Sequence, residues 1–215
     1  MGGFYPIFLS VEGARAVVVG GGPVAARKAA SLVEAGAEVT VISPVIDPRI
    51  AALANESRVT HLARRYEKGD LSGATLVIAA TDEPETNIAV ADDAKAAGVP
   101  VNCVRPPGAG NFIVPSSIHR GGLTVAISTG GGCPALSKRL RKDLEAFLGR
   151  EYAPFLEFLE YARDTLKKRL PDEDARMEVI TRLVESNLLF EFGAGRHKEA
   201  TERGRRMLEE ILAEL

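Results

Sequence analysis

In the first hundred residues, short apolar runs alternate with longer segments whose apolar side chains recur at the spacing of a helix. Such runs, separated by helical segments, are typical of strands buried in a parallel sheet. The alternation therefore predicts βαβ units with right-handed crossovers and with ligands bound at the carboxyl ends of the strands. Strands are expected at 15–19, 38–42, 59–63, 75–80 and 99–104, and helices at 23–35, 48–55 and 84–97.

After Val104 the pattern changes to a hairpin and then to helices alone. Two β-like runs, at 112–118 and 123–128, are joined by His-Arg-Gly-Gly, which predicts a hairpin turn. A basic helix is expected from Pro134 to about Leu148. Further helices are expected at 151–169, 173–190 and 198–213, because their apolar residues keep a helical period.

Two breaks in the pattern set the expected domain boundaries, one in the Pro- and Gly-rich stretch near 104–114 and one near 150. The predicted fold class is α/β, with a Rossmann-like parallel sheet followed by a β-hairpin segment and a helical domain. The expected domains are a nucleotide-binding domain at 1–111, a central segment at 112–150 and a C-terminal helical domain at 151–215.

The composition is ordinary for a globular protein, and only the local charge of one segment carries information about function. The 215 residues are 46% hydrophobic and 26% charged, and the formal net charge of −2 argues against a nucleic-acid binder. Residues 105–150 carry a local charge of +5, which fits either an anionic ligand or a solvated helix face. The chain has no long apolar run, no signal-peptide pattern and only two cysteines, so a reduced cytoplasmic protein is expected.

The sequence Gly20-Gly21-Gly22-Pro23-Val24-Ala25 fits the dinucleotide-binding pattern G-x-G-x-x-A between a strand and a helix. The first glycine allows a tight turn, Gly22 lets a pyrophosphate approach the backbone, and Ala25 permits close packing of the helix. The helix N-terminus would supply N–H groups and a partial positive charge to the phosphates. The residues expected to bind the cofactor here are Gly20, Gly22, Pro23 and Val24.

The end of the second strand leaves the choice between NAD and NADP weakly determined, with NAD favoured. Ser43 stands where an acid would bind the ribose hydroxyls, and no arginine stands at Ser43, Pro44 or Val45 to bind a 2′-phosphate. These three residues are expected to contact the cofactor, and Asp47 to cap the next helix. Thr81 and Asp82, after the strand at 75–80, are expected to face the cofactor or to cap the helix that begins at Pro84.

Five further blocks extend along most of the chain: Y-P-I-F-L, V-V-V-G-G-G-P-V-A-A-R-K-A, I-A-A-T-D, N-F-I-V-P-S and A-I-S-T-G-G-G-C-P-A-L-S-K-R-L-R. Together they resemble the siroheme-synthase N-terminal family in its stand-alone form, the precorrin-2 dehydrogenases and sirohydrochlorin ferrochelatases. The resemblance implies NAD-dependent oxidation of precorrin-2 to sirohydrochlorin in siroheme (modified porphyrin) biosynthesis, with Fe²⁺ chelation as an additional lyase activity left open. It also implies an intertwined homodimer, with 112–150 as the dimerisation segment.

The resemblance places a polycarboxylate substrate against the second Gly-rich helix start and the loop after the strand at 99–104. Cations and helix N-termini suit carboxylates, and this stretch supplies both. The residues expected to bind the tetrapyrrole are Asn102, Arg105, Ser128, Thr129, Gly130 and Lys138. No resident metal site is expected, because the three histidines and two cysteines lack ligand spacing.

One position departs from the family pattern. The motif N-V-V-D-x-P, whose Asp the family uses for both chemistries, reads Asn102-Cys103-Val104-Arg105-Pro106-Pro107 here. Arginine cannot act as a base at neutral pH, but it can bind a substrate carboxylate. Asp82 and His119 are the candidate replacements for the base. The alternatives are a dehydrogenase without chelatase activity, a tetrapyrrole carrier without chemistry, and a sensor of NAD(H).

Overall fold

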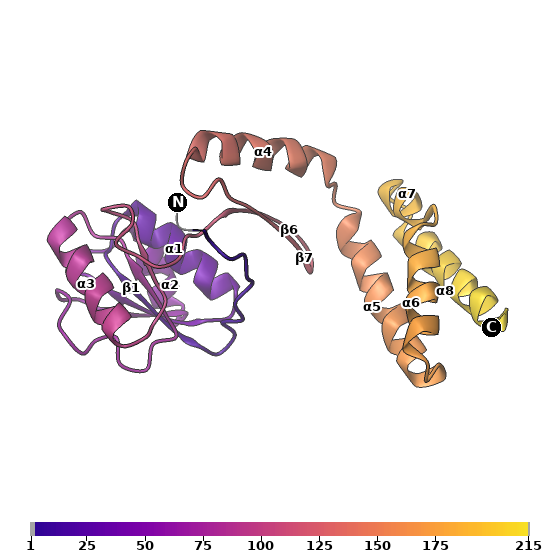
Figure 1. Cartoon of the computed structure of the whole chain (residues 1–215), viewed down its shortest axis with the longest axis horizontal. Helices are drawn as coiled ribbons and strands as arrows, with labels where there is room; N and C mark the ends of the chain where they lie inside the picture. Colours follow the sequence, from indigo (N-terminus) through magenta and orange to yellow (C-terminus); the bar gives the residue numbers. More distant parts are fainter. Residues whose placement is uncertain (1–2, 215) are drawn as a thin grey trace. The chain divides into compact units, whose positions relative to one another are not determined.

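The computed structural model describes residues 3–214, and the chain divides between Val114 and Pro115 into two compact units (Figure 1). This division lies at the end of the Pro- and Gly-rich stretch singled out in the sequence. The finer division into three domains, with a second boundary near residue 150, stays a prediction.

The first unit is a five-stranded parallel sheet in the order β3-β2-β1-β4-β5, which confirms the predicted Rossmann-like fold. Helices lie on both faces of this sheet (Figure 1). Its strands are β1 Arg15–Val19, β2 Glu38–Ile42, β3 Val59–Leu62, β4 Leu76–Ala79 and β5 Val101–Cys103. Its helices are α1 Pro23–Glu34, α2 Pro48–Asn55 and α3 Pro84–Ala96.

Strand β1 shows why the sheet is buried on both faces. Its side chains alternate between two apolar clusters: Ala16 and Val18 pack with α1 and α2, and Val17 and Val19 pack with α3. Small alanines on the helices, such as Ala25 of α1, let the helices approach the sheet closely. This two-sided burial explains why the strands read as continuous apolar runs in the sequence.

An irregular segment, not a helix, connects β3 to β4 on the α3 side of the sheet. The Arg64 guanidinium holds this segment through an ion pair with Asp70 at 2.6 Å, and Arg15 donates to the Asp70 carbonyl at 3.0 Å. The Tyr66 hydroxyl donates to Asp93 of α3 at 2.8 Å, and burial together with this carboxylate raises the pKa of Tyr66. The segment is therefore anchored, and it brings Arg65 to the carboxyl end of the sheet.

The second unit begins with an antiparallel hairpin and continues as helices. The hairpin strands are β6 Ser116–Arg120 and β7 Leu123–Ile127, so the prediction of a first strand from residue 112 was wrong at its start. The turn is Gly121-Gly122 alone, which moves His119 from the expected turn into β6. The helices are α4 Pro134–Phe147, α5 Tyr152–Arg169, α6 Glu173–Val184, α7 Leu188–Gly193 and α8 His197–Ala213.

The helix predicted at 173–190 is two helices, because Ser186 interrupts it. The Ser186 hydroxyl donates to the Leu183 carbonyl at 2.6 Å and accepts the Leu188 N–H at 3.3 Å. A serine that bonds to the backbone in this way competes with the helical hydrogen bonds and favours a new start.

The core of α5 to α8 is formed by aromatic and aliphatic side chains. The Phe192 ring lies 5.8 Å from the Phe155 ring and 6.4 Å from the Phe158 ring, between centroids. A Cβ atom at Gly204 would lie 2.5 Å from the Phe158 ring, so α8 needs glycine there to pack against α5. Within residues 3–214, no helix is long and apolar enough to cross a membrane.

Candidate functional site

A cavity of about 790 Å³ opens in the first unit, where the carboxyl ends of the strands meet. Loops that follow all five strands contribute to its wall. In a doubly wound sheet this edge is the expected ligand site, at the point where the strand order reverses around β1. The cavity is lined by residues 19–24, 42–47, 65–66, 80–83, 86 and 104–105.

The three glycines after β1 differ in what surrounds them. Gly20 has φ +125°, and a Cβ atom there would lie 2.4 Å from the Ala80 carbonyl oxygen. At Gly21 a Cβ atom would lie 1.9 Å from the Val45 carbonyl oxygen, whereas at Gly22 it would meet no atom within 4 Å. The fold therefore requires the first two glycines, and the third leaves room for a ligand beside the backbone.

The N-terminus of α1 faces this space with its backbone donors uncapped. Gly22 is the N-cap residue, no side chain caps the helix, and no acidic residue occupies its first turn. Pro23 is the first helical residue, so its missing N–H costs no hydrogen bond. A helix N-terminus of this kind binds phosphate through N–H groups and the helix dipole. The glycine turn and α1 thus fit the pyrophosphate of a dinucleotide.

The loop after β2 forms the wall on the side where an adenosine ribose is expected. The Ser43 hydroxyl donates to the Val45 carbonyl at 2.8 Å, and the Ser43 carbonyl lies 2.9 Å from His61 Nε2. Ser43, Pro44 and Val45 all line the cavity, and their contact with a cofactor stays a prediction. These bonds give the loop a fixed shape without placing an acidic group at the end of β2.

Asp47 caps α2, as the sequence predicted. Its Oδ1 atom accepts the Arg49 N–H at 3.0 Å, and the Arg49 guanidinium donates to both carboxylate oxygens at 2.9 and 3.0 Å. These bonds lower the pKa of Asp47 to about 2. Although Asp47 lines the cavity, its charge is already balanced by Arg49.

Asn87 is the residue of this site that sequence reasoning missed. It is fully buried in α3, and its Oδ1 accepts both the N–H and the hydroxyl of Thr81 at 2.9 Å. Its Nδ2 donates to the carbonyls of Thr81 at 3.0 Å and Arg105 at 2.9 Å. The prediction that Thr81 or Asp82 caps α3 was wrong: the N-cap residue is Glu83, without a side-chain cap bond. A buried asparagine in the sheet-facing row of α3 was the available signal.

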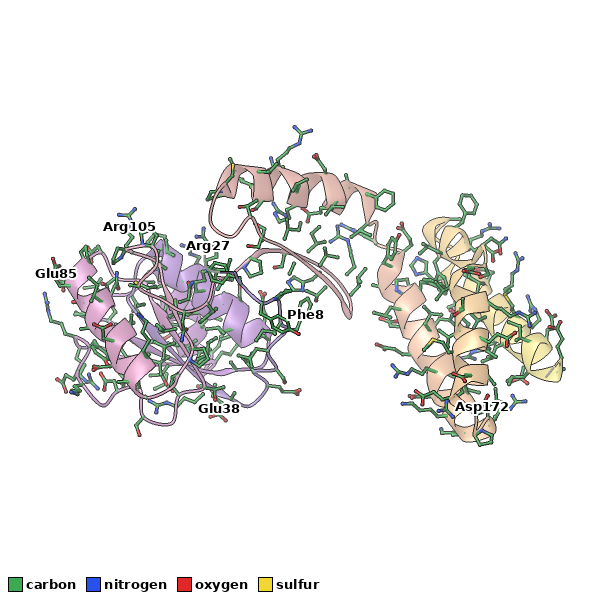
Figure 2. The ribbon with its side chains drawn as sticks, viewed as in Figure 1. Phe8, Arg27, Glu38, Glu85, Arg105 and Asp172 are labelled. Carbon is green, nitrogen blue, oxygen red and sulfur yellow. The ribbon has the colours of Figure 1, made fainter. Side chains whose placement is uncertain are left out.

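Five charged side chains line the cavity, and only two of them are not engaged. Asp47 pairs with Arg49, and Glu83 pairs with Arg65 at 3.1 Å. Asp82 and Arg105 form no ion pair or side-chain hydrogen bond with any residue that the structure describes. Arg105 and Glu85 mark this edge of the first unit in Figure 2. The site thus presents one carboxylate and one guanidinium that are available to a ligand.

Asn102, also predicted to bind substrate, does not line the cavity. Its Nδ2 donates to the Phe112 carbonyl at 2.9 Å, which ties β5 to the end of the first unit. The structure therefore gives this side chain a structural contact.

The other predicted substrate residues lie in the second unit, together with His119. The His119 ring nitrogens each lie 3.1 Å from a hydroxyl, of Thr124 and of Ser117. Ser128 Oγ accepts the Gly130 N–H at 3.0 Å, and Thr129 Oγ1 accepts the Cys133 N–H at 3.1 Å. Lys138 lies on α4, exposed and without an ion pair among residues 3–214. Catalytic or substrate-binding roles for these residues stay predictions.

Metal ligands do not cluster in the part of the chain that the structure describes: no group of three or more His, Cys, Asp or Glu side chains could hold an ion. Cys103 and Cys133 are free thiols.

Curated relatives carry the name that the sequence motifs suggested. A siroheme synthase of Thioalkalivibrio sulfidiphilus is 39% identical over 206 residues, covering 96% of this chain and 42% of the relative. A siroheme synthase of Chromobacterium violaceum is 43% identical over 173 residues, covering 80% of this chain and 37% of the relative. The chain thus spans about two fifths of the length of these relatives. The predicted resemblance to siroheme synthases is confirmed.

The fold has a solved counterpart in SirC, a precorrin-2 dehydrogenase. The TM-score is 0.76 at 23% sequence identity, covering 98% of this chain and all of the other.

Two family models match the chain. One, described as "Sirohaem biosynthesis protein central", matches residues 120–146, which cover the hairpin turn, β7, the second glycine-rich turn and nearly all of α4. The other, described as "Putative NAD(P)-binding", matches residues 7–116 and so contains the cavity, the glycine turn and the uncapped start of α1. Because that model matches more than half of the 215 residues, the chain belongs to this NAD(P)-binding family.

Proposed function

We propose that this protein is an NAD-dependent dehydrogenase that oxidises precorrin-2 to sirohydrochlorin in siroheme biosynthesis. The observation that carries the proposal is the open space beside Gly22 at the uncapped N-terminus of α1, inside a cavity large enough for a dinucleotide. The siroheme synthase relatives and the SirC fold supply the substrate class. Both free cysteines accord with a reduced cytoplasmic compartment.

In this proposal the cofactor's pyrophosphate is bound by the backbone of Gly22 and by the first N–H groups of α1 after Pro23, while Gly20, whose N–H donates to the Ile42 carbonyl, shapes the turn. The loop of Ser43 to Val45 contacts the adenosine half, and Thr81 lies toward the nicotinamide half. Bound NAD⁺ supplies the hydride acceptor of the reaction. The Asn87 hydrogen bonds keep the Thr81 loop in place while the ligands bind.

Oxidation of precorrin-2 removes a hydride and a proton, so the site must also accept a proton. Asp82 is the cavity carboxylate that is not already engaged, and we assign it the role of general base. Arg105 replaces the family's Asp, and its guanidinium would bind a carboxylate of the substrate. In this proposal Asp82 accepts the proton and Arg105 binds the substrate, whereas the family's Asp is credited with the chemistry alone.

The second unit would complete the enzyme as a homodimer. A two-stranded hairpin is marginal by itself, and most side chains of β6 and β7 are only partly buried. Leu136, Leu140 and Phe147 of α4 are exposed by 48%, 39% and 74%. Apolar exposure on this hairpin and helix supports their burial against a second copy. Light scattering with size-exclusion chromatography tests this: the wild type should be a dimer, and Phe147→Lys should be mainly monomeric.

The test of the function is an anaerobic assay of NADH formation from enzymatically made precorrin-2. We expect NADH from the wild type and none from Gly22→Asp, whose carboxylate would occupy the phosphate space. Asp82→Asn should lower kcat at least tenfold with unchanged NAD⁺ affinity. Arg105→Gln should raise the KM for precorrin-2 about tenfold or more, because a hydrogen bond between charged groups is lost.

Glu85→Gln is the matched control for Asp82, since Glu85 is exposed and lies outside the cavity lining. If the wild type binds the tetrapyrrole without forming NADH and Arg105→Asp gains activity, the protein is a tetrapyrrole carrier and not a dehydrogenase. Fe²⁺ as a second substrate stays a prediction, checked by adding Fe²⁺ to sirohydrochlorin and following siroheme formation.

A further inference from the structure

The cavity contains an ion pair that the proposed reaction does not use. Arg65, in the segment after β3, donates to Glu83 at the start of α3: Nη1 lies 3.2 Å from Oε2, and Nη2 lies 3.1 Å from Oε1. The Thr86 hydroxyl donates to the same Oε2 atom at 2.9 Å. All three side chains belong to residues that line the cavity. The Glu83 carboxylate is thus held at the wall of the site with Arg65 fixed to it.

Arg65 comes from the adenosine side of the cavity, three residues after β3, but its guanidinium pairs with Glu83, which follows β4 on the other side of β1. Strand β3 pairs with β2, and the Ser43 N–H donates at 3.1 Å to the carbonyl of Leu62, three residues before Arg65. In folds of this type the residue at the end of β2 faces the ribose hydroxyls, and an arginine nearby accommodates a 2′-phosphate. Among the lining residues Arg105 is the other cation, and it follows β5 on the opposite side of β1.

We propose that Glu83 determines the choice of dinucleotide by holding Arg65. With the pair intact, the guanidinium is neutralised and held beside the start of α3, so a 2′-phosphate at the end of β2 would gain no free cation. The site then accepts NAD, whose ribose carries only hydroxyls, and disfavours NADP. This inference rests on the proposed function, because it requires a dinucleotide in this cavity.

The experiment is calorimetric titration of NAD⁺ and NADP⁺ into the wild type, Glu83→Gln, Arg65→Gln and the double variant. The Arg65 and Glu83 side chains are 77% and 47% exposed, and Glu83 does not cap α3 with its side chain, so the variants should fold. Thermal unfolding of each variant checks this. Glu83→Gln frees a cation and removes an anion, and should lower the ratio of the NADP⁺ Kd to the NAD⁺ Kd at least fivefold. Adding Arg65→Gln should abolish that gain.

Glu85→Gln is the matched control, because it removes the same charge from the first turn of α3 but outside the cavity lining. It should leave the ratio at the wild-type value. The proposal is overturned by an unchanged ratio in Glu83→Gln, by an equal gain in Glu85→Gln, or by a gain that persists without Arg65. If the wild type binds NAD⁺ and Glu83→Gln leaves the ratio unchanged, this inference alone is wrong. If the wild type binds neither dinucleotide, the proposed function is wrong as well.

Discussion

Two glycine-rich turns lead into helices in this molecule, one in each unit, and both helices begin with proline. The turn before α1 comprises Gly20 to Gly22, and the turn before α4 comprises Gly130 to Gly132. The first turn is shaped by its neighbours: carbonyl oxygens of Ala80 and Val45 stand where Cβ atoms of Gly20 and Gly21 would be. Only its last glycine has open space beside it.

The second turn is shaped by its own hydrogen bonds. Hydroxyls of Ser128 and Thr129 accept the N–H groups of Gly130 and Cys133, and Cβ atoms at Gly130 and Gly131 would meet no atom within 4 Å. In the first turn the Gly20 N–H donates to the Ile42 carbonyl, and the N–H groups of Gly21 and Gly22 are left for a ligand. In the second turn the N–H groups of Gly130, Gly132 and Cys133 are all used internally. A glycine-rich sequence before a helix therefore does not by itself specify an anion site. The surrounding packing and hydrogen bonds determine whether its N–H groups are available.

The largest effect is expected from Gly21→Ala. Its Cβ atom would lie 1.9 Å from the Val45 carbonyl oxygen, so backbone must move. We expect a loss of about 3 kcal/mol in the free energy of unfolding, at the upper end for an overpacked site, measured by urea denaturation. A variant as stable as the wild type would show that the first turn is not held by its neighbours.

Gly22→Ala should separate the ligand from the fold. Gly22 has φ −80° and its Cβ atom would meet nothing, so stability should fall by no more than about 1 kcal/mol, the cost of alanine at a helix N-cap. The methyl group would occupy the phosphate space and weaken NAD⁺ binding about tenfold, measured by calorimetric titration. Unweakened binding would place the pyrophosphate elsewhere.

Gly130→Ala tests the second turn with the same substitution. Gly130 has φ +62°, which an alanine adopts only with strain, although no atom obstructs its Cβ. The expected cost is about 1.5 kcal/mol in unfolding free energy, with unchanged NAD⁺ affinity. A cost as large as that of Gly21→Ala would contradict the proposed difference between the turns.

Thr129→Val removes the hydroxyl that accepts the Cys133 N–H and lies 3.2 Å from the Ser137 hydroxyl. A net loss of about 1 kcal/mol is expected, because one hydrogen bond of the second turn is lost. Thr129→Ser keeps the hydroxyl and should retain most of the stability. Equal losses in both variants would assign the effect to the methyl group instead.

Acid should weaken the first turn only slightly, through Asp47, whose N–H donates to the Gly21 carbonyl at 2.7 Å. Its folded-state pKa of about 2 lies below the ordinary value of 3.8, so its contribution is present above pH 3.8 and is lost as the pH falls toward 2. The stability difference between wild type and Asp47→Asn should therefore shrink between pH 5 and pH 2. A constant difference would show that the Asp47 charge is not used.

The sheet could be predicted because strands that are buried on both faces appear in the sequence as continuous apolar runs. Strand β1 is apolar throughout, and the glycine turn after it needs only local rules. The ends of helices and strands were less predictable. Ser186 divides a predicted helix in two, although the helical spacing of apolar residues continues across it. The hydrogen bond from its hydroxyl to the backbone does not alter that spacing.

Candidate residues were predictable where they follow a strand directly, as Ser43, Thr81, Asp82 and Arg105 do. Arg65 also follows a strand closely, but it was missed because its place in the cavity depends on an ion pair with Glu83, eighteen residues further along the chain, which spacing does not reveal. Asn87 was missed because its partners are the Thr81 hydroxyl and main-chain atoms of two loops, which spacing cannot reveal.

The contact between Asn87 and position 105 has a consequence for how such a site can change. Asn87 Nδ2 bonds to the main-chain carbonyl of Arg105, and Cys103 Sγ lies 3.2 Å from that same oxygen. Both contacts ignore which side chain the residue carries. The backbone of this loop is therefore held in place whatever the side chain at position 105. An acidic side chain can be exchanged there for a basic one, which reverses the charge offered to the substrate and leaves these backbone contacts intact.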